Sequence, residues 1–225
     1  EKWPWGDNSG RWWEFRNRPD VTEDLVEPIR NRSQYATAVA PVARQNSSVR
    51  YRDRNVSGVF LQASTPSYTL VSDIDLTAGR YYTDFDYQSA RNVAVLGAAV
   101  AEQLFPATTP VGKTVRIDGH RFDVIGVLAR QGNFLGMMSL DTQIQLPLST
   151  FAKLFGTRNR SLDIQVKVAS ETRLDGAEDE LTGIVRVARG LTAGEENDFV
   201  INRQEAIRQQ FATVKLVVYG VGLFL

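Results

Sequence analysis

Alternating apolar and polar residues mark two short strands at the centre of the chain, joined by Asp118-Gly119. Asp-Gly between alternating strands favours a two-residue hairpin turn, because a type I′ turn needs positive φ at both positions. Such a turn fixes the register of the two strands. Arg116 then lies opposite Arg121, an unfavourable pair that indicates a solvated outer face. The residues predicted to share the other face are Val115, Ile117, His120, Phe122 and Val124.

The rest of the chain shows both helical and strand periodicity. Gly97 marks the end of a strand and the start of a helix. Phe105-Pro106 and Gly190 mark the ends of helices. Thr22, Ser170, and Ser149 or Thr150 are the candidate N-caps. In chain order we predict a helix at 21–32, strands at 39–44 and 48–63 with a turn at 53–55, a strand at 92–96, a helix at 98–104, the central hairpin, a strand at 143–148, a helix to 154, a strand at 162–168, a helix at 171–188, a short strand at 199–201 and a helix from 203 to about 214.

This order mixes strands and helices without a regular βαβ repeat, which predicts an α+β fold. The hairpin-bearing block, roughly residues 87–150, has the pattern of an insertion. The strand, helix and strand at 162–201 complete another unit with the strands at 39–63.

A loop interrupted by glycines follows the central hairpin, at Gln131–Asp141. It carries Phe134, Leu135, Met137 and Met138. Methionine-rich apolar surface suits contact with an adaptable partner, so these four residues are the candidate partner contacts. The alternative is that their side chains fold back and cover the sheet.

Both ends of the chain are unusual. All four tryptophans lie in the first twenty residues, which favours either a membrane interface or an arm packed on the domain. The last residues, Lys215–Leu225, are apolar after the lysine and follow a predicted helix without a break. They are too short to span a bilayer, but they fit the start of a helix that does; a buried terminal strand or helix is the alternative.

Composition narrows the chemistry. Lys and Arg together number 26, as do Asp and Glu, so no overall charge attracts nucleic acid. The arginines around residues 44–54 have neither a net positive balance nor a platform of aromatic residues between them, so a single-strand nucleic-acid site is rejected. There is no cysteine, and the lone histidine, His120, cannot build a zinc site or a catalytic triad alone. Phosphate-binding glycine motifs are missing and the acidic clusters lie on predicted polar surface. We expect no enzymatic activity, no cofactor and no metal.

Several stretches resemble one family in order and spacing. These are residues 39–71, 76–86, 92–105 (NVAVLGAAVAEQLF), 110–128 (PVGKTVRIDGHRFDVIGVL), 144–151, 186–190 and 197–207. Together they resemble the periplasmic core domain of MacB-like ABC transporter permeases, a group that includes macrolide exporters and lipoprotein-releasing permeases.

The resemblance implies a domain between the first two membrane helices of a permease, on the periplasmic side of the inner membrane. It implies a Porter-like subdomain from residues 21–86 and 151–214, a Sabre-like insertion at 87–150, a membrane-proximal arm at 1–20 and the start of a truncated membrane helix at 215–225. The implied partners are an ABC ATPase, a second permease copy and a periplasmic adaptor or membrane-fusion protein. The implied function is mechanotransmission: relay of ATP-driven helix motion to export.

Two other functions stay open at this point. One is a stand-alone extracytoplasmic module that binds a ligand or peptide in a groove near Met137 and Met138. The other is a hydrolase of unrecognised type.

Overall fold

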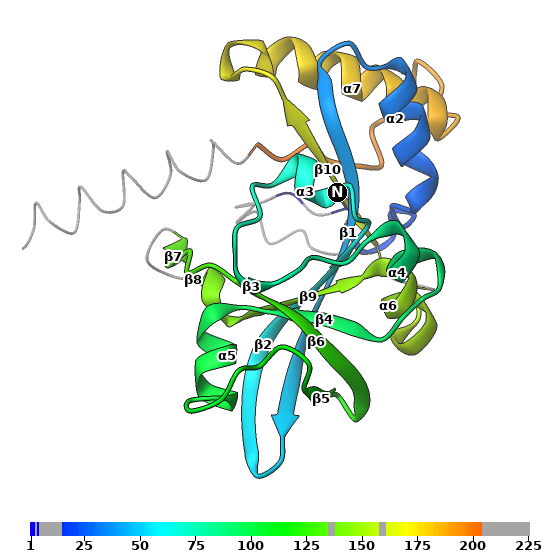
Figure 1. The fold of residues 1–225 in the computed structure, drawn as a ribbon. Helices are drawn as coiled ribbons and strands as arrows, with labels where there is room; N and C mark the ends of the chain where they lie inside the picture. The colour runs from blue at the N-terminus through cyan, green and yellow to red at the C-terminus, as the bar shows by residue number, and fades with distance from the viewer. Residues whose placement is uncertain (3, 5–14, 135–137, 158–160, 204–225) are drawn as a thin grey trace, which may run out of the picture.

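The computed structural model describes residues 1–2, 4, 15–134, 138–157 and 161–203. Helices and strands mix as predicted, and the α+β class is confirmed (Figure 1). The elements are η1 (Glu23–Leu25), α2 (Val26–Arg32), β1 (Ala36–Tyr51), β2 (Arg54–Ser64), α3 (Tyr68–Val71), β3 (Leu76–Gly79), α4 (Asp84–Gln88), β4 (Val93–Leu96), α5 (Ala98–Leu104), β5 (Thr114–Ile117), β6 (His120–Leu128), β7 (Asn133–Phe134), β8 (Met138–Ser139), η2 (Leu140–Thr142), β9 (Gln143–Pro147), α6 (Leu148–Phe155), β10 (Asp163–Val168), η3 (Glu171–Arg173) and α7 (Leu174–Ala188).

Most strands form one mixed sheet in the order β10-β1-β2-β9-β4-β6-β3, and β5 pairs with both β1 and β6. The β2–β9 and β4–β6 pairs are parallel and the others antiparallel. β1 is 16 residues long and joins the two ends of the molecule. Residues 36–42 pair with β10, whereas Val49 and Arg50 pair with β5.

The predicted break after Arg44 is wrong. β1 continues through the polar residues Gln45 and Asn46, whose backbones pair with Leu61 and Phe60 of β2. A bulge between Ser47 and Ser48 takes up the irregularity. Because ladder hydrogen bonds come from the backbone, a few polar side chains do not end a strand that keeps a partner.

The central hairpin is confirmed in detail. Asp118 and Gly119 have φ of 44° and 88°, and Ile117 pairs with His120. Arg116 lies opposite Arg121, both exposed. The predicted inner face is buried at Val115, Ile117, Phe122 and Val124. His120 is the exception, because it is exposed at the turn with its ring 5.4 Å from that of Phe155.

The N-cap prediction at Ser149 or Thr150 is wrong, and the one at Thr22 is right in position only. α6 begins after Pro147, and its first hydroxyls bind carbonyls of another segment: Ser149 donates to Tyr87 O and Thr150 to Arg91 O. Thr22 is at the N-cap position of η1, as predicted, but its hydroxyl donates to the Asp24 carboxylate and makes no side-chain cap hydrogen bond. The hydroxyls of Ser149 and Thr150 therefore make tertiary contacts and do not cap α6.

Two hydrophobic clusters fill the ends of the fold. Near α2 and α7, the first combines Val21, Leu25, Val26, Ile29, Val39, Leu181, Ile184, Val185 and Phe199. The second lies lower in Figure 1 and draws on β1, β2, β4, β5, β6, β9, α5 and α6. Since β1 and β2 contribute to the lower cluster together with the 94–151 segment, the expected Porter-like and Sabre-like parts share one sheet; their boundaries stay a prediction.

Candidate functional site

The predicted partner-contact loop leaves the sheet as a small separate ladder. β7 pairs with β8, with Asn133 opposite Ser139 and Phe134 opposite Met138. Leu135 and Met137 lie outside the described residues, as does the segment from 204 to 225. The backbone thus brings Phe134 and Met138 together at the base of the loop.

Asp141 fixes the point where this loop returns to the sheet. Its carboxylate accepts hydrogen bonds from Gln131 N at 2.7 Å and from Gly132 N at 3.2 Å and 3.3 Å, and the residue is only 5% exposed. The backbone of Gly97 packs directly on this corner, where an added Cβ would lie 2.8 Å from Gln143 O. The loop is therefore held at both ends of its ladder by a buried carboxylate.

The two ends of the described chain are fastened to each other and to α7. Glu1 N donates to Val200 O at 2.9 Å and Val200 N donates back to Glu1 O at 2.8 Å. Arg189 holds Asp198 through two hydrogen bonds of 2.7 Å and 2.9 Å. Arg203 binds Glu178 at 2.5 Å and Asp175 at 2.7 Å on α7. We call this set of contacts the exit clamp.

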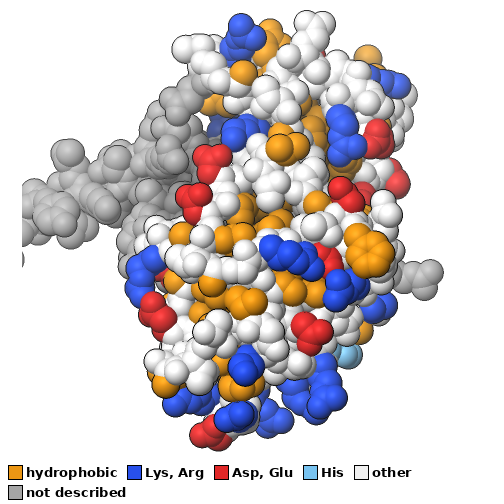
Figure 2. All heavy atoms as spheres, in the orientation of Figure 1, with side chains coloured by type: hydrophobic (Ala, Val, Ile, Leu, Met, Phe, Trp, Pro, Cys, Tyr) orange, Lys and Arg blue, Asp and Glu red, His pale blue; other side chains and the backbone are white. Residues whose placement is uncertain are grey.

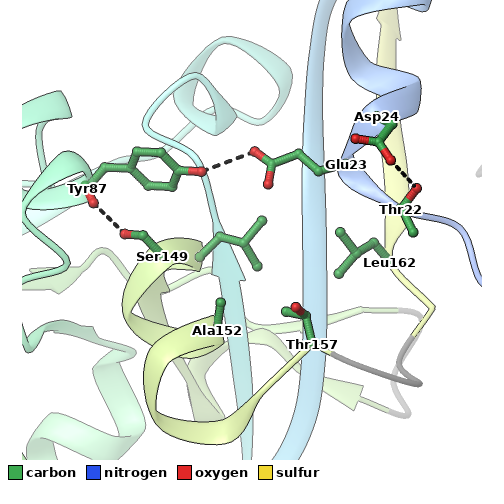
Figure 3. Close-up of a pocket in the computed structure, with 9 residues that line it drawn as sticks. Thr22, Glu23, Asp24, Tyr87, Ser149, Ala152, Thr157 and Leu162 are labelled. Carbon is green, nitrogen blue, oxygen red and sulfur yellow. Dashed lines mark hydrogen bonds between the residues drawn. The ribbon is translucent and has the colours of Figure 1, made fainter.

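A pocket of about 250 Å³ lies between η1 and α6 (Figure 3). Across it the Tyr87 hydroxyl donates to Glu23 Oε1 at 3.1 Å. Burial, with the Glu23 carboxylate next in importance, raises the pKa of Tyr87 to about 12. The lining residues are Thr22, Glu23, Asp24, Tyr87, Leu148, Ser149, Ala152, Thr157 and Leu162. The Tyr87–Glu23 hydrogen bond thus links α4, which packs against the lower hydrophobic cluster, to η1, which belongs to the cluster near α2 and α7.

Asp86 is the most enclosed carboxylate among the described residues, with no exposed surface. It accepts from Arg80 at 2.6 Å and Arg91 at 2.9 Å. Thr83 completes a capping box with it at the start of α4. The Arg80 hydrogen bond holds the pKa of Asp86 well below its usual value despite burial. The cluster fixes α4, and with it Tyr87, against the sheet.

The structure assigns tertiary contacts to some carboxylates that sequence analysis placed on simple polar surface. Glu178 belongs to the exit clamp, and Glu180 accepts from Ser33 Oγ and Gln34 N. In the described part of the chain, no group of three His, Cys, Asp or Glu residues is placed to hold a metal ion. Likewise, none of the described helices has the length and apolar character needed to cross a bilayer.

The profile of the MacB-like periplasmic core domain matches residues 3–184 of this chain. The chain belongs to this family. The pyoverdine export ATP-binding/permease protein PvdT of Pseudomonas aeruginosa is 30% identical over 214 residues, which is 90% of this chain and 32% of that protein. The macrolide export ATP-binding/permease protein MacB of Bdellovibrio bacteriovorus is 27% identical over 230 residues, covering 90% and 33% respectively. The chain thus spans about a third of the length of these two relatives.

Solved structures show the same MacB-like fold. The periplasmic region of MacB from Actinobacillus actinomycetemcomitans matches with a TM-score of 0.68 at 22% identity, covering 86% of this chain and 83% of that one. The extracellular domain of the transporter YknZ from Gram-positive bacteria matches with a TM-score of 0.65 at 24% identity, covering 77% and 86%. The predicted family resemblance is confirmed.

Sequence reasoning missed Asp86, Asp141 and Arg203. The partners of Asp141 and Arg203 lie nine or more residues away, so spacing along the chain carries no sign of those contacts. The partners of Asp86 are local, and Thr83 three residues before it is the spacing of a capping box, a signal that was available. The position of Asp141 as the last residue of the predicted loop was also a usable signal.

Proposed function

We propose that this domain is the periplasmic relay of an ABC transporter permease. It sits on the periplasmic side of the inner membrane, works with an ABC ATPase and a second permease copy, and carries ATP-driven motion of membrane helices to export of a substrate. The domain performs no chemistry itself. Support comes from the family of the chain and from ATP-binding/permease proteins among its relatives.

The observation that carries the proposal is the exit clamp. A membrane helix can move a domain only if the connection between them is stiff. Here the chain before residue 204 is bound to α7 through Arg203 and to the start of the chain through Val200. A displacement of the segment beyond Arg203 is thereby delivered to α7 instead of being absorbed by a loose linker.

The second step is transmission through the domain. Close-packed interiors transmit strain because they are hard to compress. β1 runs without interruption from β10, beside α2 and α7, to β5 at the other end of the sheet. The Tyr87–Glu23 bond adds a cross-link between the two clusters. The domain therefore moves as one stiff body.

The proposed output is the β7–β8 loop. Phe134, Leu135, Met137 and Met138 remain the proposed contacts with a periplasmic adaptor or membrane-fusion protein. The buried Asp141 carboxylate supports this role, because it fixes the base of the loop to the sheet that moves.

The test makes the connection after Arg203 flexible and leaves the sequence of the domain before it unchanged. A flexible Gly-Ser segment of about ten residues, inserted after Arg203 in the full-length permease with its ATPase, should uncouple helix from domain. These 225 residues contain no cysteine, so once any cysteines in the rest of the permease and its ATPase are replaced, a spin label at an exposed Ser57→Cys gives one distance between the two copies. We expect ATP to shift this distance in the parent protein and not in the insertion variant, with ATP hydrolysis retained.

The matched control carries the same insertion after Gly194, in an exposed turn between Arg189 and Asp198 of the exit clamp. It should keep the ATP-dependent shift, because the contacts of Asp198, Val200 and Arg203 are untouched. A shift that survives the insertion after Arg203, or the lack of any inter-copy distance in the parent, contradicts the proposal.

A further inference from the structure

Three arginines lie side by side on the outer face of the sheet. Arg50 of β1 is the register partner of Arg116 of β5, and Arg116 is the partner of Arg121 of β6. All three residues are exposed, while their strand neighbours Val49, Ile117 and Phe122 point into the core. We call this set the arginine row. Figure 2 shows Lys and Arg side chains gathered at this lower end of the molecule, in a chain whose net charge is zero.

The arginine row is not neutralised within the described structure. No ion pair joins Arg50, Arg116 or Arg121 to a carboxylate there; Arg116 donates only to Gly119 O, at 3.3 Å. The neighbouring acids are engaged elsewhere. Asp118 accepts from Ser48 and Gln45 groups, and Asp123 from Thr114.

Like charges directly opposite each other destabilise a sheet. The row repeats that arrangement twice across adjacent strands, so folding gains nothing from it. Local rules of this kind are broken mainly at functional sites. The arginine row is therefore a candidate contact surface.

The geometry indicates the partner's form. Neighbouring strands lie about 4.8 Å apart, so the three guanidinium groups start from a straight ladder with that step. Residues at i and i+4 on a helix surface are about 5–6 Å apart, which is a close match. Each guanidinium fork can take a carboxylate through two parallel hydrogen bonds.

The partner is another protein and not a second copy of this chain docking through its acidic helix. α7 carries four acidic residues, of which Asp175 and Glu178 bind Arg203 and Glu180 binds Ser33 and Gln34, which leaves only Asp179 outside these contacts. An anionic lipid surface attracts Lys and Arg alike and needs no regular spacing. The arginine row lies on paired strands and can bind regularly spaced carboxylates through two hydrogen bonds each, so it favours an acidic protein segment over a lipid surface.

We propose that Arg50, Arg116 and Arg121 bind an acidic α-helix of a partner protein, with carboxylates repeating every fourth residue. The inference goes beyond the proposed function, because the arginine row can bind such a helix whether or not the domain relays motion.

The test uses a labelled synthetic peptide of about 20 residues, long enough to be helical, with Glu at every fourth position of one face. A scrambled peptide of the same composition is the comparison. Binding to the intact chain is measured by fluorescence anisotropy at low and high salt. We expect the patterned peptide to bind at least tenfold more tightly than the scrambled one, and more weakly at high salt.

Three variants separate the explanations. R50T/R116T/R121T should lose the preference between the two peptides. R50K/R116K/R121K keeps the charge but loses the fork, and should bind the patterned peptide several-fold more weakly. R30T/R32T/R173T removes the same charge from exposed positions elsewhere and should bind like the parent.

Vesicles of phosphatidylglycerol provide the competing surface. Equal binding of both peptides, no binding of either, or unchanged binding by the Lys variant overturns the proposal. Strong vesicle binding that survives in the Lys variant, without peptide preference, would assign the row to a membrane surface.

Discussion

The hydroxyl of Tyr87 in α4 donates a hydrogen bond to the carboxylate of Glu23 in η1, 3.1 Å away. The two residues are far apart in sequence and belong to different ends of the fold. Their bond spans the pocket in Figure 3, and the ring of Tyr87 packs against the lower cluster. It links the elements that the proposed relay has to keep together.

Tyr87→Phe should lower the free energy of unfolding by about 1 kcal/mol at neutral pH, since one hydrogen bond is lost. The pKa of Tyr87 is raised from 10.0 to about 12, so the hydroxyl contributes stability that is present below pH 10 and is lost as the pH rises to 12. Urea unfolding at several pH values checks this. The gap between parent and variant should narrow above pH 10, and Glu23→Gln, which retains an acceptor, should cost less.

Asp86→Asn should cost about 2 kcal/mol at neutral pH, because the charged hydrogen bonds from Arg80 and Arg91 lose their buried carboxylate while the two arginines stay half exposed. The folded-state pKa of Asp86 is depressed, so its contribution is present above the unfolded pKa near 4 and is lost as the pH falls below it. Acid unfolding curves should therefore converge toward low pH. Asp84→Asn, on the exposed side of the same helix, should change stability by less than about 1 kcal/mol. Parallel curves for the parent and Asp86→Asn would argue against the assignment.

Gly97→Ala should destabilise the domain by about 3 kcal/mol, since the added methyl group meets the backbone oxygens of Asp141 and Gln143. Gly183→Ala is the matched control. Gly183 lies inside α7 with nothing near its Cβ position, so alanine there should stabilise by about 0.5–1 kcal/mol. Thermal unfolding of both variants gives the comparison, and similar melting temperatures would refute the close approach at Gly97.

Phe122→Ala should cost about 3–5 kcal/mol, because Phe122 is fully buried on the inner face of the central hairpin. Phe85→Ala should stay within about 0.5 kcal/mol of the parent, since Phe85 is 67% exposed. Guanidinium unfolding measures both. A large loss at Phe85 would mean that its ring is covered in the protein as tested.

The sequence predicted best where the structure is decided locally. The Asp118-Gly119 turn sets its own register through two positive φ angles, and the pairing of Arg116 with Arg121 follows from it. The helix predicted at 171–188 is likewise found, as η3 followed by α7.

Non-local pairing could not be predicted in the same way. Nothing in the residues of β2 indicates that it lies parallel to β9, or that β1 meets β10 at one end and β5 at the other. Thr150 has the chemistry of an N-cap, yet it donates to Arg91 O, because the competing acceptor comes from a distant part of the chain.

The reciprocal hydrogen bonds between Glu1 and Val200 also hold residues 1 and 200 next to each other, which suits the domain for insertion into another protein. Domains with adjacent termini can be spliced into a loop of an unrelated host without stretching it. Residues 1–203 should therefore fold when they are inserted into such a loop, with the same two backbone hydrogen bonds holding the two insertion points together.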